Sequence, residues 1–456
     1  MNKLLALFLL AIPFTAMAQS TKIKIKNLDK ERAACWQQYA EGIKRQRQIL
    51  PAILPPLSNG AHDTLPLPVQ LESNAKGEPV DMNYFYGYKG AQPTAEHKSA
   101  AFIYLHGSGP RVAEWATGLK LCNMFNDSPS VYIIPQIPQE GEWYRWYQKS
   151  KQWAWDAMLR CLLARPDIDA SRIYIFGISE GGYGSQRLAS FYADYLAAAG
   201  PMAGGEPLKN APAENLRHIA FTLRTGANDN GFYREKLTRY TAAALDSLQA
   251  ATLDSPETAA NSDSLQTANS DSLQTANSGD FRHWVELIPG RGHSIDYRPT
   301  PEYLRAFERR ALPKHFSWED YEMDGQHRTG FYYLAVDKRS NDTLRTRYDV
   351  SIEDNADGSA KVCIDVRNVF YTTTETDPRW GIELKFNRSY STATGGRLTL
   401  FLDEHLINLK KSVTVFVNGK QLFSGRPRLE REALQRSIAL WGDPLRMLPV
   451  AITLDY

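Results

Sequence analysis

The sequence predicts an α/β fold, a doubly wound and mostly parallel sheet, followed by a small all-β, sandwich-like C-terminal domain. Short apolar strands alternate with helical segments between residues 98 and 310, as in parallel sheets covered on both faces. After Pro313 that alternation gives way to short strand-like segments. Between the two, Gly-Ile-Ser-Glu-Gly (177–181) follows an apolar strand and opens a helix, which predicts a sharp strand-to-helix turn around Ser179.

The expected elements of the first domain can be stated in order. A helix is predicted over residues 27–48, and strands are predicted at 69–71, 83–86, 100–105, 131–134, 173–176, 196–199, 219–223 and 284–288. Further helices are expected at about 115–124, 151–164, 180–192, 232–248 and 301–309. In such a sheet, functional side chains gather where the parallel strands end.

The later segments predict a β-sandwich. Strands are expected at 331–336, 361–366, 381–386, 397–402, 413–417 and 451–454, and Asn418-Gly419 predicts a tight hairpin from 413–417 to 421–423. Trp318 and Trp380 could bind a sugar at the surface, but packing in the core is the preferred interpretation.

Four segments follow from this pattern. Residues 1–18 have the basic start, apolar run and small-residue cleavage site of a secretory signal peptide. Residues 19–64 form an N-terminal helical segment, 65–312 the α/β domain and 313–456 the β-domain. A polar tandem repeat at 246–279 is expected to be a disordered insertion. We therefore expect an exported protein, periplasmic or secreted. The residue directly after the cleavage site is Gln19 and not a cysteine, which argues against a lipid anchor.

Composition excludes some classes of function. The 456 residues are 43% hydrophobic and 23% charged, with a net charge of +2, which is typical of a globular protein and lacks the basic surface that nucleic-acid binding requires. No segment after residue 18 is apolar enough to span a membrane. The four cysteines (Cys35, Cys122, Cys161, Cys363) lack metal-ligand spacing and are expected to be buried free thiols rather than disulfides. Nothing indicates a metal or an organic cofactor.

The candidate chemistry is nucleophilic catalysis. If Ser179 is the nucleophile, its acid and base should follow later strands of the same sheet. Asp229 follows the strand at 219–223, and His293 follows the strand at 284–288 within a glycine-rich loop. In these positions His293 would accept the Ser179 proton, and Asp229 would orient the imidazole. Other candidates are Glu206 or Asp296 for the acid, and His283 for the base, although His283 begins a strand rather than following one.

An acyl-transfer site also needs two N–H donors for the oxyanion. One is expected from Glu180, directly after the nucleophile, and the other from Ser108 or Gly109 in the loop His-Gly-Ser-Gly (106–109). His106 is expected to brace that loop rather than act as a base. Trp143, Tyr144 and Trp146 follow the strand at 131–134 and could stack on a sugar or an aromatic acyl group, or equally pack on Trp153 and Trp155.

These motifs carry a resemblance. Leu-His-Gly-Ser-Gly (105–109), Gly-Ile-Ser-Glu-Gly-Gly (177–182), Thr-Gly-Ala-Asn-Asp (225–229) and Gly-Arg-Gly-His (290–293) make residues 98–310 resemble the α/β-hydrolase superfamily. The elbow is similar to that of prolyl-oligopeptidase-like peptidases and of feruloyl- or polyhydroxybutyrate-type esterases. The tail at 413–425, with Trp-Gly-Asp-Pro (441–444), resembles the C-terminal β-module of exported bacterial hydrolases. The resemblance implies a serine hydrolase, although the repeat insertion departs from the pattern.

Three functions remain open at this point. The leading hypothesis is an exported serine esterase acting on a small-molecule or glycan ester. Only about 18 residues separate the strand at 196–199 from the strand at 219–223, which leaves no room for a large helical cap, so the site should be open and admit an ester or amide attached to a bulky group. The same triad would also serve a serine peptidase acting on a peptide substrate. A non-catalytic, glycan-binding or cell-envelope protein with a hydrolase-like core is the third.

Overall fold

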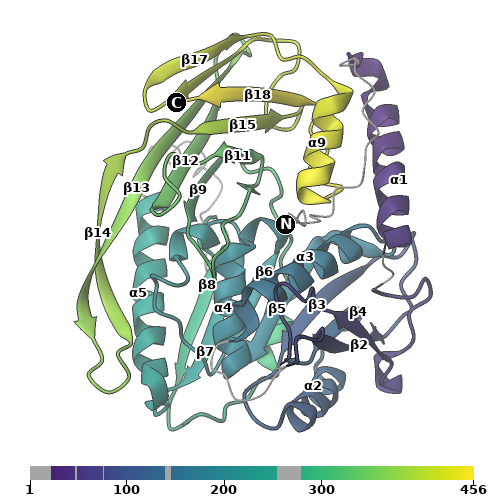
Figure 1. The fold of residues 1–456 in the computed structure, drawn as a ribbon, viewed down its shortest axis with the longest axis vertical. Coiled ribbons are helices and arrows are strands. Elements are labelled where there is room, and N and C mark those ends of the chain that lie inside the picture. The colour runs from purple at the N-terminus through teal and green to yellow at the C-terminus, as the bar shows by residue number, and fades with distance from the viewer. Residues whose placement is uncertain (1–21, 47–48, 75, 139–144, 254–278) are drawn as a thin grey trace, which may run out of the picture.

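The computed structural model describes residues 22–46, 49–74, 76–138, 145–253 and 279–456 (Figure 1). The predicted signal peptide and most of the repeat insertion therefore lie outside the described residues. The domain limits proposed from the sequence stay predictions.

The first sheet has eight strands in the order β1-β2-β4-β3-β5-β6-β7-β8. β2 runs antiparallel to both neighbours, whereas the pairs from β4 to β8 are parallel. Together with its flanking helices, this order is the α/β-hydrolase fold, and the predicted fold class is confirmed. The strands are β1 (His62–Pro66), β2 (Asp81–Lys89), β3 (Ser99–Leu105), β4 (Ser130–Pro135), β5 (Ile168–Ile178), β6 (Ala198–Met202), β7 (Ala220–Gly226) and β8 (His283–Ile288).

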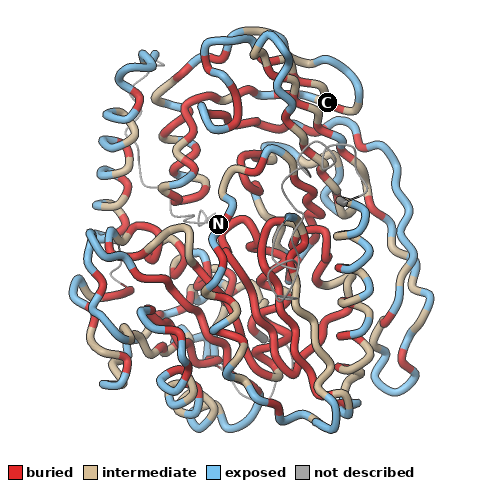
Figure 2. Tube along the Cα trace, turned by 180° about the vertical axis from the view of Figure 1, so that it is seen from behind, coloured by how far each residue is buried: buried red, intermediate tan, exposed pale blue. Residues whose placement is uncertain are grey.

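Both faces of this sheet are buried, which is why its central strands read as continuous apolar runs. On one face Ile103 and Ile175 belong to a core cluster shared with α3 (Lys149–Leu163) and α4 (Glu180–Phe191). On the other face Phe102 belongs to a second cluster shared with α2 (Arg111–Met124) and α8 (Pro299–Leu304). Figure 2 shows these buried residues concentrated in the sheet. α5 (Arg234–Leu253) follows β7.

The C-terminal domain packs two sheets. One has the order β10-β11-β15-β18, and the other β17-β16-β13-β12-β9 with β14 paired to β13. The strands are β9 (His315–Asp320), β10 (Gly330–Phe331), β11 (Leu334–Lys338), β12 (Arg345–Asp354), β13 (Ala360–Thr376), β14 (Glu383–Thr392), β15 (Arg397–Leu402), β16 (Val413–Val417), β17 (Lys420–Gly425) and β18 (Val450–Asp455). Asn418 and Gly419 both have positive φ, as the predicted hairpin requires.

Several local predictions were wrong. Residues 69–71 form a turn instead of a strand. The predicted strand at 331–336 is divided between β10 and β11, because Tyr332 has a φ of 52° and breaks the extended chain. Residues 246–253, assigned to the disordered insertion, continue α5, where Leu248 packs against the core. β9, β12 and the helix α9 (Arg431–Trp441) were missed.

The N-terminal segment joins the two domains. The helix α1 (Leu28–Gln46) lies beside α9 (Figure 1), and Arg32 forms an ion pair with Glu404 of the C-terminal domain. Short 3₁₀ turns lie at Ile25–Asn27, Leu57–Asn59, Arg145–Tyr147, Ala193–Tyr195, Ala213–Leu216 and Gly231–Tyr233. Of the helices that the structure describes, none combines the length and apolar character that a membrane crossing requires.

All four cysteines are free. Cys35, Cys122 and Cys161 are buried as expected, with Cys122 in α2 and Cys161 in α3. Cys363 differs from the prediction because it is partly exposed. It lies on β13, where residues alternate between the core face and the other face of the sheet, and Val362 and Ile364 take the core side.

Candidate active site

The turn between β5 and α4 places Ser179 at the end of the central strand. Ser179 has φ 58° and ψ −113°, a strained conformation for a residue with a side chain. The turn is possible only with glycines beside it: a Cβ at Gly177 would lie 2.3 Å from the Gly181 carbonyl oxygen, and one at Gly181 would lie 2.0 Å from the Leu105 oxygen. The two glycines of the motif therefore bring α4 against β3 and β5.

Ser179, His293 and Asp229 form one continuous hydrogen-bonded chain. Ser179 Oγ lies 2.9 Å from His293 Nε2, and His293 Nδ1 lies 2.7 Å from Asp229 Oδ2. With Nδ1–H donating to the carboxylate, Nε2 is free to accept the serine proton. Asp229 is 4% exposed and the His293 side chain 46% exposed, so the acid is shielded while the base faces the solvent.

The loops that carry the acid and the base are joined to each other. Asn228 N–H donates to the Arg291 oxygen at 2.8 Å, and Ala227 N–H donates to the Ile288 oxygen at 2.9 Å. A Cβ at Gly226 would lie 2.0 Å from the Gly292 oxygen, so the close approach of the loops requires glycine there. Backbone contacts thus set the distance between Asp229 and His293.

Arg234, in the first turn of α5, holds the other oxygen of the acid. Its Nη1 donates to Asp229 Oδ1 at 2.8 Å, and the arginine is itself buried. Both carboxylate oxygens of Asp229 are therefore engaged, which fixes its plane relative to His293. Sequence reasoning missed this residue, although an arginine five positions after a candidate acid was a visible signal.

The alternative candidates for the acid and the base have partners outside the triad. Glu206 is 1% exposed and accepts from Arg187 Nε at 2.7 Å. Asp296 pairs with Arg298, which lowers the pKa of its carboxyl to about 2. His283 lies 3.0 Å from Asp246 and 2.7 Å from the Phe281 oxygen, in a separate pair at the start of β8.

The loop after β3 passes directly beside the nucleophile. A Cβ at Gly107 would lie 3.3 Å from the Ser179 Cβ, so Gly107 directly neighbours the serine. Ser108 and Gly109 are exposed next to it, and Glu180 N–H lies in the first turn of α4 at its positive end. The assignment of Ser108, Gly109 and Glu180 to the oxyanion site stays a prediction, to which Gly107 is added.

His106 braces this loop, as the sequence predicted. It is 1% exposed, its Nδ1 lies 2.7 Å from the Gly107 oxygen, and its Nε2 accepts from Ile137 N–H at 3.0 Å. Both ring nitrogens are thus occupied by backbone groups. The neighbouring Glu114 carboxyl packs against Gly109, and burial raises the pKa of Glu114.

The aromatic cluster after β4 is only partly described. Trp143 and Tyr144 lie outside the described residues. Trp146 is 1% exposed, donates to the His106 oxygen at 3.2 Å and packs 6.0 Å from the ring of Trp155. The expectation that Trp146 binds substrate was therefore wrong; it packs in the core because Gly184 of α4 leaves room for its ring.

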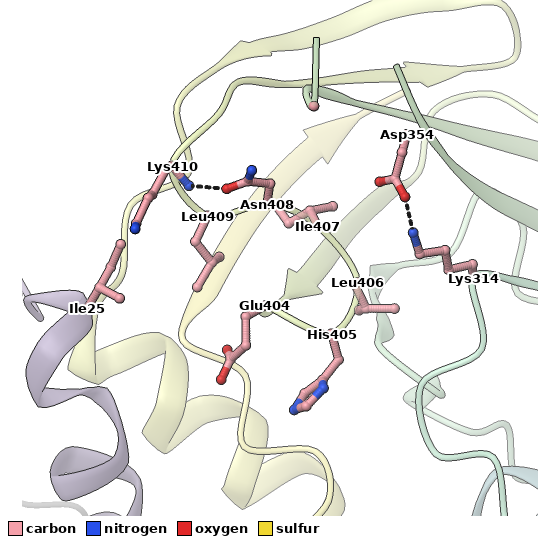
Figure 3. Close-up of a pocket in the computed structure, with 11 residues that line it drawn as sticks. Ile25, Lys314, Asp354, Glu404, His405, Leu406, Ile407, Asn408, Leu409 and Lys410 are labelled. Atoms are coloured by element: carbon pink, nitrogen blue, oxygen red, sulfur yellow. Dashed lines mark hydrogen bonds and ion pairs between the residues drawn. The ribbon is translucent and has the colours of Figure 1, made fainter. Parts of the chain in front are cut away.

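Two cavities differ in whether their lining residues belong to the segments that carry the triad. The first, of about 560 Å³, is lined by Ile25 and by residues between Lys314 and Lys410 (Figure 3), which belong to the N-terminal segment and the C-terminal domain. The second, of about 240 Å³, is lined by Tyr183 of α4 and Phe232, close in sequence to Ser179 and Asp229, and by Trp380 of the C-terminal domain. Only the second adjoins the elements that carry the triad.

Within the described part of the chain, His218, Asp280 and His315 are grouped so that their ligand atoms lie within 4.8 Å of one another. Arg217 and Arg310 also pair with Asp280, at 2.7 and 3.1 Å. Two guanidinium groups already neutralise this carboxylate, so the cluster is better suited to joining the domains than to holding a cation.

Comparisons with known proteins find similarity to solved structures. No family model matches the chain, and no curated protein matches its sequence. A thermostable esterase is 20% identical with a TM-score of 0.33, and the match covers 42% of this chain and 52% of that chain, about half its length. A phospholipase/carboxylesterase from Dyadobacter fermentans is 14% identical (TM-score 0.31; 49% and 94% covered). A poly(3-hydroxybutyrate) depolymerase from Bordetella parapertussis is 13% identical (TM-score 0.37; 54% and 88% covered). The fold assignment rests on the strand order described above.

Proposed function

We propose that the protein is an exported serine hydrolase that cleaves a carboxylic ester through an acyl-enzyme intermediate. The observation that carries the proposal is the hydrogen-bonded chain from Ser179 through His293 to Asp229, at 2.9 and 2.7 Å, with Ser179 on a strained turn. A serine that only begins a helix would require neither a strained backbone conformation nor a histidine and a buried carboxylate aligned with its hydroxyl.

The reaction follows from the positions of these groups. His293 Nε2 removes the proton from Ser179 Oγ as the oxygen attacks the ester carbonyl, and a tetrahedral oxyanion forms. The N–H of Glu180 and an N–H of the 107–109 loop stabilise the oxyanion. His293 then protonates the leaving alcohol, which departs as the acyl-enzyme forms. Water, activated by His293, releases the acid and restores the Ser179 hydroxyl.

The exposure of the site supports a substrate with a bulky group. Only short segments connect β6 to β7, and the His293 side chain is 46% exposed. Water can therefore reach the acyl-enzyme, and a large leaving group need not be enclosed. Export is supported by the pattern of residues 1–18.

A fluorophosphonate probe tests the chemistry directly. The wild-type protein should be labelled at Ser179, and Ser179→Ala should lose labelling together with a drop in kcat on the order of 10⁶-fold on p-nitrophenyl acetate. His293→Ala should lose a comparable amount, whereas His283→Ala, from the pair with Asp246, should retain activity. Absence of labelling in folded wild-type protein would contradict the proposal and favour a binding protein.

The bond that is cleaved needs a second comparison. We expect p-nitrophenyl acetate to be turned over faster than aminoacyl-nitroanilides of similar size. The reverse order would assign the same triad to a serine peptidase. Both measurements use the full mature chain, and recovery of the protein from the periplasm or the medium tests export.

A further inference from the structure

The longest hairpin of the described C-terminal domain reaches the catalytic domain. β13 and β14 extend beyond their sheet and run along α5 (Figure 1). Trp380, in the connection between them, and Phe386, on β14, line the 240 Å³ cavity together with Tyr183 and Phe232 of the catalytic domain. The two domains therefore form this cavity together.

Two residues that line the cavity belong to the segments that carry the triad. Tyr183 lies one helical turn after Ser179, and its N–H donates to the Ser179 backbone carbonyl oxygen at 3.1 Å. Phe232 follows Asp229 by three residues and has φ 51°, a strained value for a phenylalanine. The Arg234 guanidinium, which binds Asp229, lies 5.3 Å from the Phe232 ring and 5.9 Å from the Tyr183 ring. Two aromatic rings that line the cavity thus lie beside the arginine that binds Asp229.

Contacts along α5 and the β6–β7 connection hold the hairpin in place. Glu375 forms an ion pair with Lys236 and accepts from the Tyr240 hydroxyl at 3.0 Å. Lys209 donates to Glu383 at 2.7 Å. These contacts fix the hairpin on both sides of its tip. Trp380 is nevertheless 51% exposed, with its ring 5.1 Å from that of Phe232.

The lining is polar but carries no uncompensated charge among its described ionisable groups. Glu206 accepts from Arg187 at 2.7 Å and from Asn210 Nδ2 at 3.2 Å, and Glu383 is paired with Lys209. A charged ligand would have to displace one of these pairs, at a cost in desolvation. A neutral ligand with several hydroxyl groups could hydrogen-bond to them and leave the pairs intact.

The aromatic residues define the shape of that ligand. Trp380, Phe232, Phe386 and Tyr183 offer ring faces whose negative potential favours contact with C–H bonds. A volume of about 240 Å³ is below the range of about 300–1,000 Å³ typical of drug-sized ligands, so the cavity suits a single ring. A pyranose combines a C–H face with a rim of hydroxyls that can hydrogen-bond to the polar lining, whereas an aromatic acyl group would cover that lining without forming hydrogen bonds to it.

We propose that this cavity binds one neutral pyranose ring of an ester substrate, and that the C-terminal domain thereby supplies part of the substrate site. The inference rests on the proposed esterase function for its catalytic part. Packing in the core, the interpretation preferred from the sequence, is confirmed for Trp318, which is 2% exposed, and is wrong for Trp380, which is 51% exposed. The proposal gives Trp380 the sugar-binding role that was the alternative.

Binding can be measured without turnover. Saturation-transfer difference NMR with methyl β-glucopyranoside, methyl β-galactopyranoside, methyl α-mannopyranoside and methyl β-xylopyranoside should show transfer to at least one sugar in the wild-type protein. Trp380→Ala should abolish that transfer, and Phe370→Ala should retain it. Phe370 is 40% exposed on the same hairpin and lies outside the cavity lining, so it is a matched control. No transfer to any of the four sugars, or transfer retained in Trp380→Ala, would overturn the proposal.

Kinetics separate this inference from the proposed function. Trp380→Ala should lower kcat/KM for the monoacetate of the sugar that binds about 10-fold more than it lowers kcat/KM for p-nitrophenyl acetate. The difference should arise mainly from a higher KM. An equal loss of kcat/KM on both esters would contradict a sugar site. So would a loss seen only with a third substrate, methyl ferulate, which carries an aromatic acyl group and no sugar. If p-nitrophenyl acetate is not hydrolysed and the fluorophosphonate does not label, the esterase proposal fails while the NMR result still decides the sugar site.

Discussion

Asp229 is the residue on which the orientation of the catalytic base depends. One of its oxygens binds His293 at 2.7 Å and the other binds Arg234 at 2.8 Å. A carboxylate held on both sides can accept only the Nδ1 proton of His293, which leaves Nε2 facing Ser179. An amide at the same position would present an N–H to the ring or rotate away from it.

We therefore expect Asp229→Asn to lower kcat on p-nitrophenyl acetate by about 10⁴-fold, because the imidazole would hold the wrong tautomer. The matched control is Asp246→Asn, which alters the other Asp–His pair, Asp246 with His283 at 3.0 Å. Steady-state kinetics of the two variants, with circular dichroism to verify folding, provide the measurement. Equal activities would show that Asp229 does not orient the base.

For single residues, the sequence predicted the proposed triad but not the neighbouring residues that hold it in position. Ser179, Asp229 and His293 could be proposed because each follows a strand of a fold with known chain order. Gly107 could not be assigned, since its position depends on the close approach of another loop. Arg234 was missed because nearness to Asp229 in the sequence does not reveal the direction of its side chain. Trp146 was misassigned because adjacency to a strand end does not reveal which way a ring points.

At the scale of the element, the β5–α4 turn depends on contact between backbones. Gly181 lies where α4 meets the end of β3, and a Cβ there would lie 2.0 Å from the Leu105 oxygen. Gly292, in the loop before His293, has nothing within 4 Å of the corresponding position. A side chain would therefore clash at Gly181 but would have open space at Gly292.

Gly181→Ala should destabilise the protein by about 1–3 kcal/mol or more, because the strand and the helix must separate to admit the methyl group. Gly292→Ala should change the free energy of unfolding by less than about 1 kcal/mol. Urea denaturation followed by tryptophan fluorescence compares the two variants. A Gly181→Ala protein as stable as wild type would mean that the turn adopts another geometry.

At the scale of the whole molecule, a buried cluster of charges joins the domains. Arg309 of the first domain pairs with Asp443 at 2.9 Å, and Arg446 bridges Asp443 and Asp194. Burial raises the pKa of Asp443, but the charges of Arg309 and Arg446 outweigh it and lower the pKa to about 2. The cluster therefore stabilises the joined domains while Asp443 is ionised.

The sign of the pH dependence follows. The folded pKa of Asp443 is about 2, below the unfolded value of 3.8, so its contribution is fully present above about pH 4 and is lost as the pH falls towards 2. The contribution is about 2 kcal/mol of unfolding free energy. Urea titrations between pH 6 and pH 2.5 should show this loss in the wild type, and it should be absent in Asp443→Asn.

At neutral pH Asp443→Asn should cost about 3–5 kcal/mol, because the buried Arg309 loses the carboxylate that it pairs with and Arg446 keeps Asp194 but loses Asp443. Asp455→Asn is the control, since Asp455 is 69% exposed and its pair with Arg397 should contribute less than about 1 kcal/mol. Similar stabilities for the two variants would contradict a structural role for the buried cluster.

By itself, the sequence determined the fold class and pointed to Ser179, Asp229 and His293, which the structure joins by hydrogen bonds. Apolar periodicity, glycine positions and chain order are local properties, so they can be recognised in one stretch at a time. α9 and the strands β9 and β12 were missed, although they too are continuous segments of chain.

Only the tertiary structure decided which residues surround the triad. Trp380 lies against Phe232, 148 positions earlier in the sequence, and Arg446 pairs with Asp194, 252 positions earlier. Such contacts depend on how two domains pack, and no local pattern encodes that packing. The proposed sugar site, unlike the turn that carries Ser179, therefore depends on both domains being packed together.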